Sequence, residues 1–340
     1  MGKQENTPDL RAARFGLNLR SKGKFKWAFT FTADYQESRT RDDAYIQVYD
    51  FKLDIPIGPV KLTLGKQKEP FCYELVGLMP ALPQQERMMG PFYVTRNTGI
   101  QLSGQLIGDR MTWWAGAFND WLETSNNLNR TATNWDARVT GLPYVTEDNF
   151  NYLHLGLGGG RVGSDDGMMR FSGKPSMNKA DKYVDTKSFT ADHASKLSFE
   201  AILSLAPILL QAEHIEAWVE APDSGNPRFS GTYVSASWVL TGESRPYIRS
   251  LGYAGAITPK NRFGAIELIG RYGYVNLTDG SIDGGIMNHW YLGANWWASR
   301  QWKFGVSYGN CNLDRDALTG NTNMLPVSYT HLTLPTTPYV

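Results

Sequence analysis

Long runs of alternating apolar and polar residues constrain this chain more than any other feature of its sequence. Between residues 25 and 35 every second residue is apolar, namely Phe25, Trp27, Phe29, Phe31, Ala33 and Tyr35. Most residues between them are polar. Because successive side chains of a strand point to opposite faces, this pattern predicts strands with one apolar and one polar face.

The alternation recurs along the chain and predicts an antiparallel all-β protein. We expect fourteen strands, at 10–20, 24–36, 43–53, 59–67, 95–107, 110–120, 133–141, 150–161, 194–206, 207–218, 230–241, 262–275, 287–298 and 301–312. Many run near eleven residues, as strands tilted by about 45° across a bilayer do. Short connections mostly alternate with long ones, which is typical of transmembrane β-barrels. The long stretch 241–261 breaks this alternation and contains either a hidden strand or an extended periplasmic connection.

Composition excludes several classes of protein. Lys plus Arg number 34 and Asp plus Glu 33, so no overall positive charge favours nucleic acid as a partner. The most apolar stretch, 201–212, contains Pro207 and is too short for a transmembrane helix. Residues 1–9 are polar, so the protein is cytosolic or its export signal is missing from this sequence. Neither the two cysteines nor the five histidines have the spacing of a metal site, and we expect no cofactor.

Two motifs carry a family resemblance, GKQKEPF at 65–71 and TGESRPY at 241–247. Shorter segments agree in order: Arg11 to Leu17, Asp43 to Tyr45, Val60 to Gly65, Glu86 and Arg87, Arg96 to Gly99, Trp113 to Asn119, Tyr183 to Thr186, Gln211 to Glu213, and Phe229 to Gly231. Together they resemble the phosphate-selective porin O and P family of Gram-negative outer membranes, over roughly residues 11 to 312.

The resemblance implies a 16-stranded, trimeric outer-membrane channel. Residues 10–312 then form an incomplete porin domain that lacks one strand at each end. If strand 59–67 is the fifth of the complete barrel, residues 68–94 are the third external loop, which folds inward as a constriction. The end of the chain, 327–340, looks like a translated sequencing adaptor fused in frame. We expect this non-native tail to form no barrel strand, because Pro335 and Pro338 interrupt pairing.

An anion-selective pore requires cationic side chains on its inner wall and at its narrowest point. The predicted polar faces supply Arg14, Arg20, Lys24, Lys26, Lys61, Arg138, Arg271 and Lys303. In or beside the proposed constriction lie Lys66, Lys68, Arg87 and Arg96. Alternatively, these cations are ordinary solvated residues or partners of Asp34, Glu69, Glu86 and Asp136. The predicted substrate is phosphate or another small anion, and the alternative is a general or non-phosphate porin.

Other patterns favour structural roles or different functions. Gly158 to Gly163 matches GxGxxG, but no helix pattern follows, which favours a glycine-rich loop. Met88 and Met89 are expected to pack a folded loop against the wall. Trp113 and Trp114 are adjacent, so one of them must point inward. One alternative is a phospholipase-like barrel enzyme, but this sequence has no recognisable Ser–His arrangement for it. Another is a soluble carbohydrate-binding β-sandwich, which would have no reason to sort its loops by length.

Overall fold

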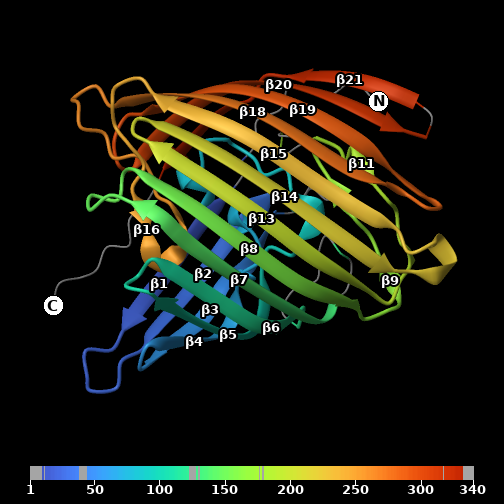
Figure 1. The fold of residues 1–340 in the computed structure, drawn as a ribbon, viewed down its shortest axis with the longest axis horizontal. Helices are drawn as coiled ribbons and strands as arrows, with labels where there is room; N and C mark the ends of the chain where they lie inside the picture. Colours follow the sequence, from blue (N-terminus) through green and yellow to red (C-terminus); the bar gives the residue numbers. More distant parts are fainter. Residues whose placement is uncertain are drawn as a thin grey trace.

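The computed structural model describes residues 10, 12–37, 44–121, 128, 131–175, 177, 180–316 and 318–331. Within them a 16-stranded antiparallel sheet pairs almost every strand with its neighbours in sequence. Figure 1 shows the tilted strands curling from β1 to β21 around the segment 68–96. The strands of this wall are β1 (Ala13–Arg20), β2 (Ala28–Glu37), β3 (Ala44–Ile57), β4 (Val60–Gln67), β5 (Asn97–Leu106), β6 (Met111–Asn119), β7 (Thr131–Val145), β8 (Tyr152–Ser164), β13 (His193–Leu205), β14 (Ile208–Glu220), β15 (Arg228–Val239), β18 (Ala265–Asp279), β19 (Ile282–Trp297), β20 (Trp302–Arg315), β21 (Leu318–Met324) and β22 (Val327–His331).

The outer face of the wall is apolar where the sequence alternates. In β1 the side chains of Phe15, Leu17 and Leu19 are exposed, whereas Arg14 pairs with the buried Asp34 on the other face. This arrangement confirms the predicted antiparallel all-β fold. Each of the fourteen predicted strands has a counterpart in the wall, which β21 and β22 extend to sixteen. No helix among the described residues is long and apolar enough to cross a membrane.

The turn between β1 and β2 corrects one predicted strand. The ladder ends at the pair Arg20 and Ala28, so Lys24 and Lys26 lie exposed in the turn and not on the polar face of a strand. The Ser21 hydroxyl donates to the Phe25 carbonyl at 2.7 Å, and the Ser21 backbone N–H donates to the Trp27 carbonyl at 2.9 Å. These local hydrogen bonds satisfy the backbone of the turn without a strand partner.

The C-terminal end of the wall corrects a second prediction. Residues 327–331 do form a strand: β22 pairs with β20, Val327 opposite Val306, and β21 pairs Met324 with Gly309 in the same register. The two strands thus occupy one position beside β20, separated only by Leu325 and Pro326. If β4 is the fifth strand of a complete barrel, this position is the sixteenth. Among the described residues, no pairing joins β1 to β21 or β22, and residues 332–340 lie outside the description.

Three long connections carry the smaller elements. Segment 68–96 contains α1 (Tyr73–Val76), η1 (Met79–Ala81) and η2 (Gly90–Phe92). The connection after β8 contains β9 (Met168–Met169), β10 (Ser172–Gly173), β11 (Val184–Asp185) and β12 (Phe189–Thr190). The connection after β15 contains β16 (Tyr247–Ile248), η4 (Arg249–Leu251) and β17 (Tyr253–Ala254). The short η3 (Pro222–Ser224) follows β14. Both alternatives for 241–261 therefore hold in part, because the extended connection includes a tiny strand pair.

Apolar residues of segment 68–96 pack against the inner face of the wall. Phe92, Met88 and Met89 are buried in one cluster with Phe171 and Phe229, so the two methionines pack as predicted. Burying such side chains contributes about 1.5–3 kcal/mol each. Segment 68–96 is therefore fixed to the wall by a true apolar core.

The glycine run 158–163 lies inside strand β8, so the predicted glycine-rich loop is wrong. A Cβ atom at Gly158 would lie 1.8 Å from the Phe71 carbonyl oxygen, and one at Gly160 would lie 1.9 Å from an Asp136 carboxylate oxygen. Glycine is needed at these positions because another chain segment or side chain approaches the strand backbone closely.

Candidate functional site

Segment 68–94 is held against the wall by buried carboxylates. The Glu213 carboxylate of β14 accepts hydrogen bonds from the backbone N–H groups of Tyr73 (2.7 Å) and Glu74 (3.2 Å) at the start of α1. The Glu74 carboxylate in turn accepts from the N–H of Met89 at 2.7 Å and pairs with Arg271 of β18. Breaking a buried ion pair of this kind costs about 3–5 kcal/mol, so the segment is anchored firmly.

The next part of the segment is fixed through its backbone carbonyl groups. Lys303 of β20 donates to the Leu82 carbonyl at 3.0 Å, and the Asn295 amide of β19 donates to the Pro83 carbonyl at 2.8 Å. Arg245 donates to the Ala81 carbonyl and pairs with Glu267 at 2.8 Å. Arg245 belongs to the TGESRPY motif, to which the sequence alone gave no role.

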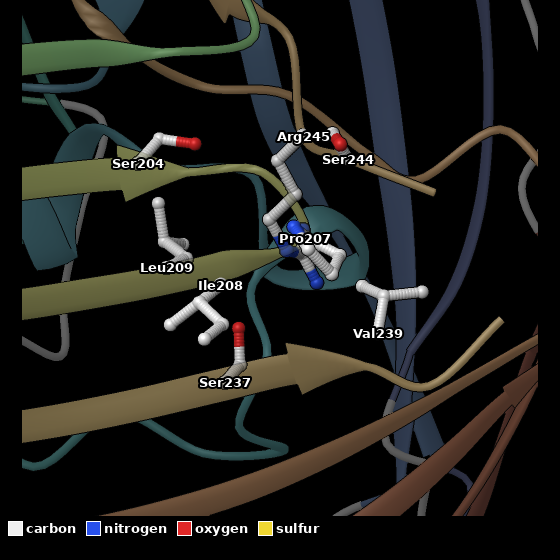
Figure 2. A pocket seen from close by; sticks show the side chains of 8 residues that line it. All are labelled: Ser204, Pro207, Ile208, Leu209, Ser237, Val239, Ser244 and Arg245. Atoms are coloured by element: carbon white, nitrogen blue, oxygen red, sulfur yellow. The ribbon is translucent and has the colours of Figure 1, made fainter. Parts of the chain in front are cut away.

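A small hollow beside Arg245 does not provide a ligand site. Figure 2 shows the Arg245 side chain against Pro207, at the turn between β13 and β14. The hollow has a volume of about 10 Å³, which is no more than one water requires. The role of Arg245 is therefore to hold segment 68–94.

The connection after β15 enters the barrel from the opposite end. The Tyr247 hydroxyl lies 2.6 Å from His154 Nδ1, and His154 Nε2 lies 2.8 Å from the Glu200 carboxylate. Arg138 pairs with Glu200 at 2.6 Å and donates to the Gly252 carbonyl at 2.8 Å. The side chains of Arg138, His154 and Glu200 are fully buried. Wall strands β7, β8 and β13 are thereby tied to this connection.

The two inward segments meet at Tyr73. Its hydroxyl accepts hydrogen bonds from the Ala254 N–H at 3.2 Å and from the Gln211 amide at 3.1 Å. Burial raises the pKa of Tyr73 to about 12, so the hydroxyl stays protonated at neutral pH. Trp114 is the inward member of its pair and lies near Gly252 and Arg138.

The structure separates the predicted pore cations into two groups. Arg138, Arg271 and Lys303 lie beneath the inward segments with buried partners, away from any open inner surface. Lys68 and Arg87 both donate to the last carbonyl groups of α1, and each reaches the Gly77 oxygen, at 2.9 and 2.6 Å. Cations at a helix C-terminus stabilise its unpaired carbonyl groups.

Burial of the Lys68 ammonium group, together with nearby Arg87 and Arg96, holds its pKa well below the ordinary value. Asp50 opposes this shift, and Arg14 adds to it. Lys68 thus lies within the field of three guanidinium groups. Lys68, Arg87, Arg96 and Arg14 thus concentrate positive charge beside segment 68–94.

Two of these guanidinium groups sandwich one aromatic ring. Arg14 of β1 lies 3.7 Å and Arg96 lies 3.5 Å from the centre of the Tyr49 ring. Arg14 also pairs with Asp34 at 3.2 Å, and Arg96 with Asp50 at 3.0 Å. Arg96 Nη1 is buried and has no hydrogen-bond partner in the described part of the chain. Arg14 is the more accessible of the two, because its side chain is 31% exposed against 8% for Arg96.

A β-bulge in β3 creates the stack. Opposite β2, Val48 pairs with Ala33 and Asp50 with Thr32, so Tyr49 is an extra residue in the ladder. Val48 before the bulge and Phe51 after it are both exposed on the outer face. The bulge therefore leaves Tyr49 inward, where strict alternation counted back from Phe51 would place it outward.

The remaining predicted cations are not members of the stack. Lys61 pairs with Asp54 at 3.6 Å, Arg20 is exposed at the end of β1, and Lys66 is buried near the end of β4. No three metal-ligating side chains lie together in the ranges that the structure covers.

Comparison with known proteins identifies the family. The family model described as "Phosphate-selective porin O and P" matches residues 2–327. The chain belongs to the phosphate-selective porin O and P family. Porin O of Pseudomonas aeruginosa is 25% identical over 174 residues, which are 47% of this chain and 38% of that protein. The match therefore spans well under half of this curated relative.

Solved structures share the fold of this porin at low sequence identity. An anion-selective porin from Comamonas acidovorans matches with a TM-score of 0.59 at 10% identity, covering 96% of this chain and 90% of that one. OprB of Pseudomonas putida matches with a TM-score of 0.56 at 9% identity, covering 94% and 87%. The trimer form of OmpT from Vibrio cholerae matches with a TM-score of 0.52 at 12% identity, covering 94% and 91%. These similarities establish a porin fold.

Sequence reasoning missed Tyr49, Glu213 and Arg245 as site residues. Glu213 could have been suspected, because a carboxylate between the inner-face residues Leu209 and Ile215 needs a partner. Arg245 stands in a motif that the resemblance already singled out. The sequence contains no signal for the inward position of Tyr49, because it depends on the bulge.

Proposed function

We propose that this porin forms a passive, anion-selective diffusion channel in the Gram-negative outer membrane, for phosphate or a related oxyanion. The observation that supports this is the stack of Arg14, Tyr49 and Arg96 on the inner face of the wall, near segment 68–94. A guanidinium group matches the oxygens of an oxyanion with two parallel donors, whereas an ammonium group acts as a point charge. The proposal includes no chemical step and no enzyme activity.

The acidic neighbours of the stack limit how tightly an anion binds. Asp34 and Asp50 each neutralise part of the charge of their arginine partners. Conduction requires sites that attract an ion without trapping it, so partial neutralisation favours transit. An oxyanion would be attracted by the guanidinium groups of Arg14 and Arg96 as it passes the stack, while retaining part of its hydration.

In this proposal, segment 68–94 forms the constriction. The whole protein assembles as a homotrimer that is surrounded by outer-membrane lipids. The buried contacts of Glu74, Glu213 and Lys303 support a fixed constriction. The trimer form of the structurally similar OmpT supports the assembly. Residues 327–340 are proposed to be non-native, in accord with a family match that ends at residue 327.

The test is a pair of double variants that remove the same charge from different places. R14Q/R96Q removes both guanidinium groups of the stack, and K24Q/K26Q removes two exposed cations from the turn after β1. In planar bilayers under a salt gradient, R14Q/R96Q should shift the reversal potential toward cations, while K24Q/K26Q should match the unmodified protein. Equal reversal potentials for all three proteins would refute the assignment of the stack.

Competition between ions tests the substrate. Phosphate added to a chloride solution should reduce the chloride current of the unmodified protein, and R14Q/R96Q should lose this block. If added phosphate left the chloride current of both proteins unchanged, this protein would be a general anion porin.

A further inference from the structure

The outer face of the wall carries a row of arginines and tryptophans that the channel does not use. Across five strands, from β7 to β15, the residues Trp135, Arg161, Ser195, Trp218 and Arg228 are paired in one continuous row. Trp135 is 60% exposed and Trp218 42%, and both arginines are exposed. The Arg228 guanidinium lies 5.7 Å from the Trp218 ring centre. This row thus presents two cations and two aromatic rings on the side facing away from the pore.

The position of the row relates it to the membrane. Further along the same strands, away from the long connections 165–192 and 221–227, the outer face carries the exposed side chains of Leu157, Phe199 and Leu210. Long connections of such barrels lie on the external side. The arginine–tryptophan row therefore lies just external to an apolar surface that acyl chains cover, at the depth of outer-leaflet headgroups.

A polar hollow adjoins the row at Arg228. Its volume is about 260 Å³, and its lining is Glu216, Arg228, Ser230, Asn276, Thr278 and Asp279. Arg228 Nε donates to Glu216 at 2.6 Å, and its backbone N–H donates to Asp279 at 2.7 Å. The remaining oxygens and amide groups of the hollow can donate to and accept from hydroxyl groups. Its chemistry suits a sugar better than an acyl chain.

We propose that this surface binds the phosphorylated sugar headgroup of an outer-leaflet glycolipid. Arg161 and Arg228 would bind phosphate groups, and the hollow would take a sugar ring beside Trp218. The acyl chains of the same molecule would cover Leu157, Phe199 and Leu210, so one ligand accounts for both the polar and the apolar parts of the surface. The inference rests on the outer-membrane location in the proposed function but not on anion transport.

The test compares two double variants of equal charge. R161Q/R228Q removes the cations of the row, and R110Q/R300Q removes two exposed cations from the turns after β5 and β19, at the other end of the barrel. The probe is purified lipopolysaccharide in phosphatidylethanolamine vesicles, with lipopolysaccharide-free vesicles as the blank. R161Q/R228Q should bind lipopolysaccharide roughly tenfold more weakly, as the loss of two charge-assisted contacts implies. R110Q/R300Q should bind like the unmodified protein.

Three outcomes would overturn the proposal. These are equal lipopolysaccharide affinity in the two variants, an equal loss of affinity in both, and a change of oligomeric state in R161Q/R228Q without a change in lipopolysaccharide binding. The last would make the surface a protein interface. Reversal potentials of R161Q/R228Q should match those of the unmodified protein, which separates a failure of this proposal from a failure of the channel.

Discussion

Gly158 provides a direct test of where segment 68–94 lies. In G158A the new methyl group would lie 1.8 Å from the Phe71 carbonyl oxygen if nothing moved. Ordinary contact requires the carbonyl to retreat by roughly 1.5 Å, away from β8 and toward the interior of the barrel. Forcing one extra carbon into a well-packed site costs about 1–3 kcal/mol of folding free energy.

The adjacent Gly159 supplies a matched control. A Cβ atom there would face outward, and its nearest neighbours would be 3.9 Å away. G159A should therefore leave the packing unchanged and alter the free energy of unfolding by less than about 1 kcal/mol, in the stabilising direction. The two variants differ only in the face of β8 that receives the methyl group.

Two measurements decide the outcome. Urea unfolding of the folded protein in detergent, followed by tryptophan fluorescence, should give a lower free energy of unfolding for G158A than for G159A. Single-channel conductance should fall in G158A, because the displaced segment narrows the lumen. If G158A matched G159A in both measurements, Phe71 would not lie against β8, and the position of the whole segment would be wrong.

Two further predictions concern Lys68 and the C-terminal strand. Because the pKa of Lys68 in the folded protein lies well below 10.5, unfolding takes up a proton between the folded and unfolded values, and the free energy of unfolding should rise with pH through that window. Urea titrations from neutral pH to about pH 10 should show this rise against K68M as reference, and a constant difference between the two proteins would contradict it. Gly305 and Ser328 are directly opposite in β20 and β22, so G305C/S328C should form a disulfide on mild oxidation, whereas the offset pair G305C/T330C should not. Equal cross-linking of both pairs would show that residues 327–331 have no fixed register.

The sequence determined the strands and the face that each one presents. Phe15, Leu17 and Leu19 alternate with polar residues, and the backbone geometry of a strand converts that period into an outer apolar face. The sequence also indicated the family, because GKQKEPF and TGESRPY are long contiguous motifs. In the turn after β1, local hydrogen bonds of Ser21 ended the ladder where alternation alone predicted a strand.

The tertiary structure decided which charges face an open path. Arg138 and Arg14 look alike in sequence, yet one is buried against Glu200 and the other stacks on Tyr49. Their partners come from other strands, and a bulge sets the direction of Tyr49, so no local pattern encodes the difference. Residues 327–331 form a strand for a related reason: the edge of β20 offers unpaired N–H and C=O groups to any backbone that can extend along it. Alternation is a property of single strands, whereas the pairing of charges and edges depends on what the folded chain brings together.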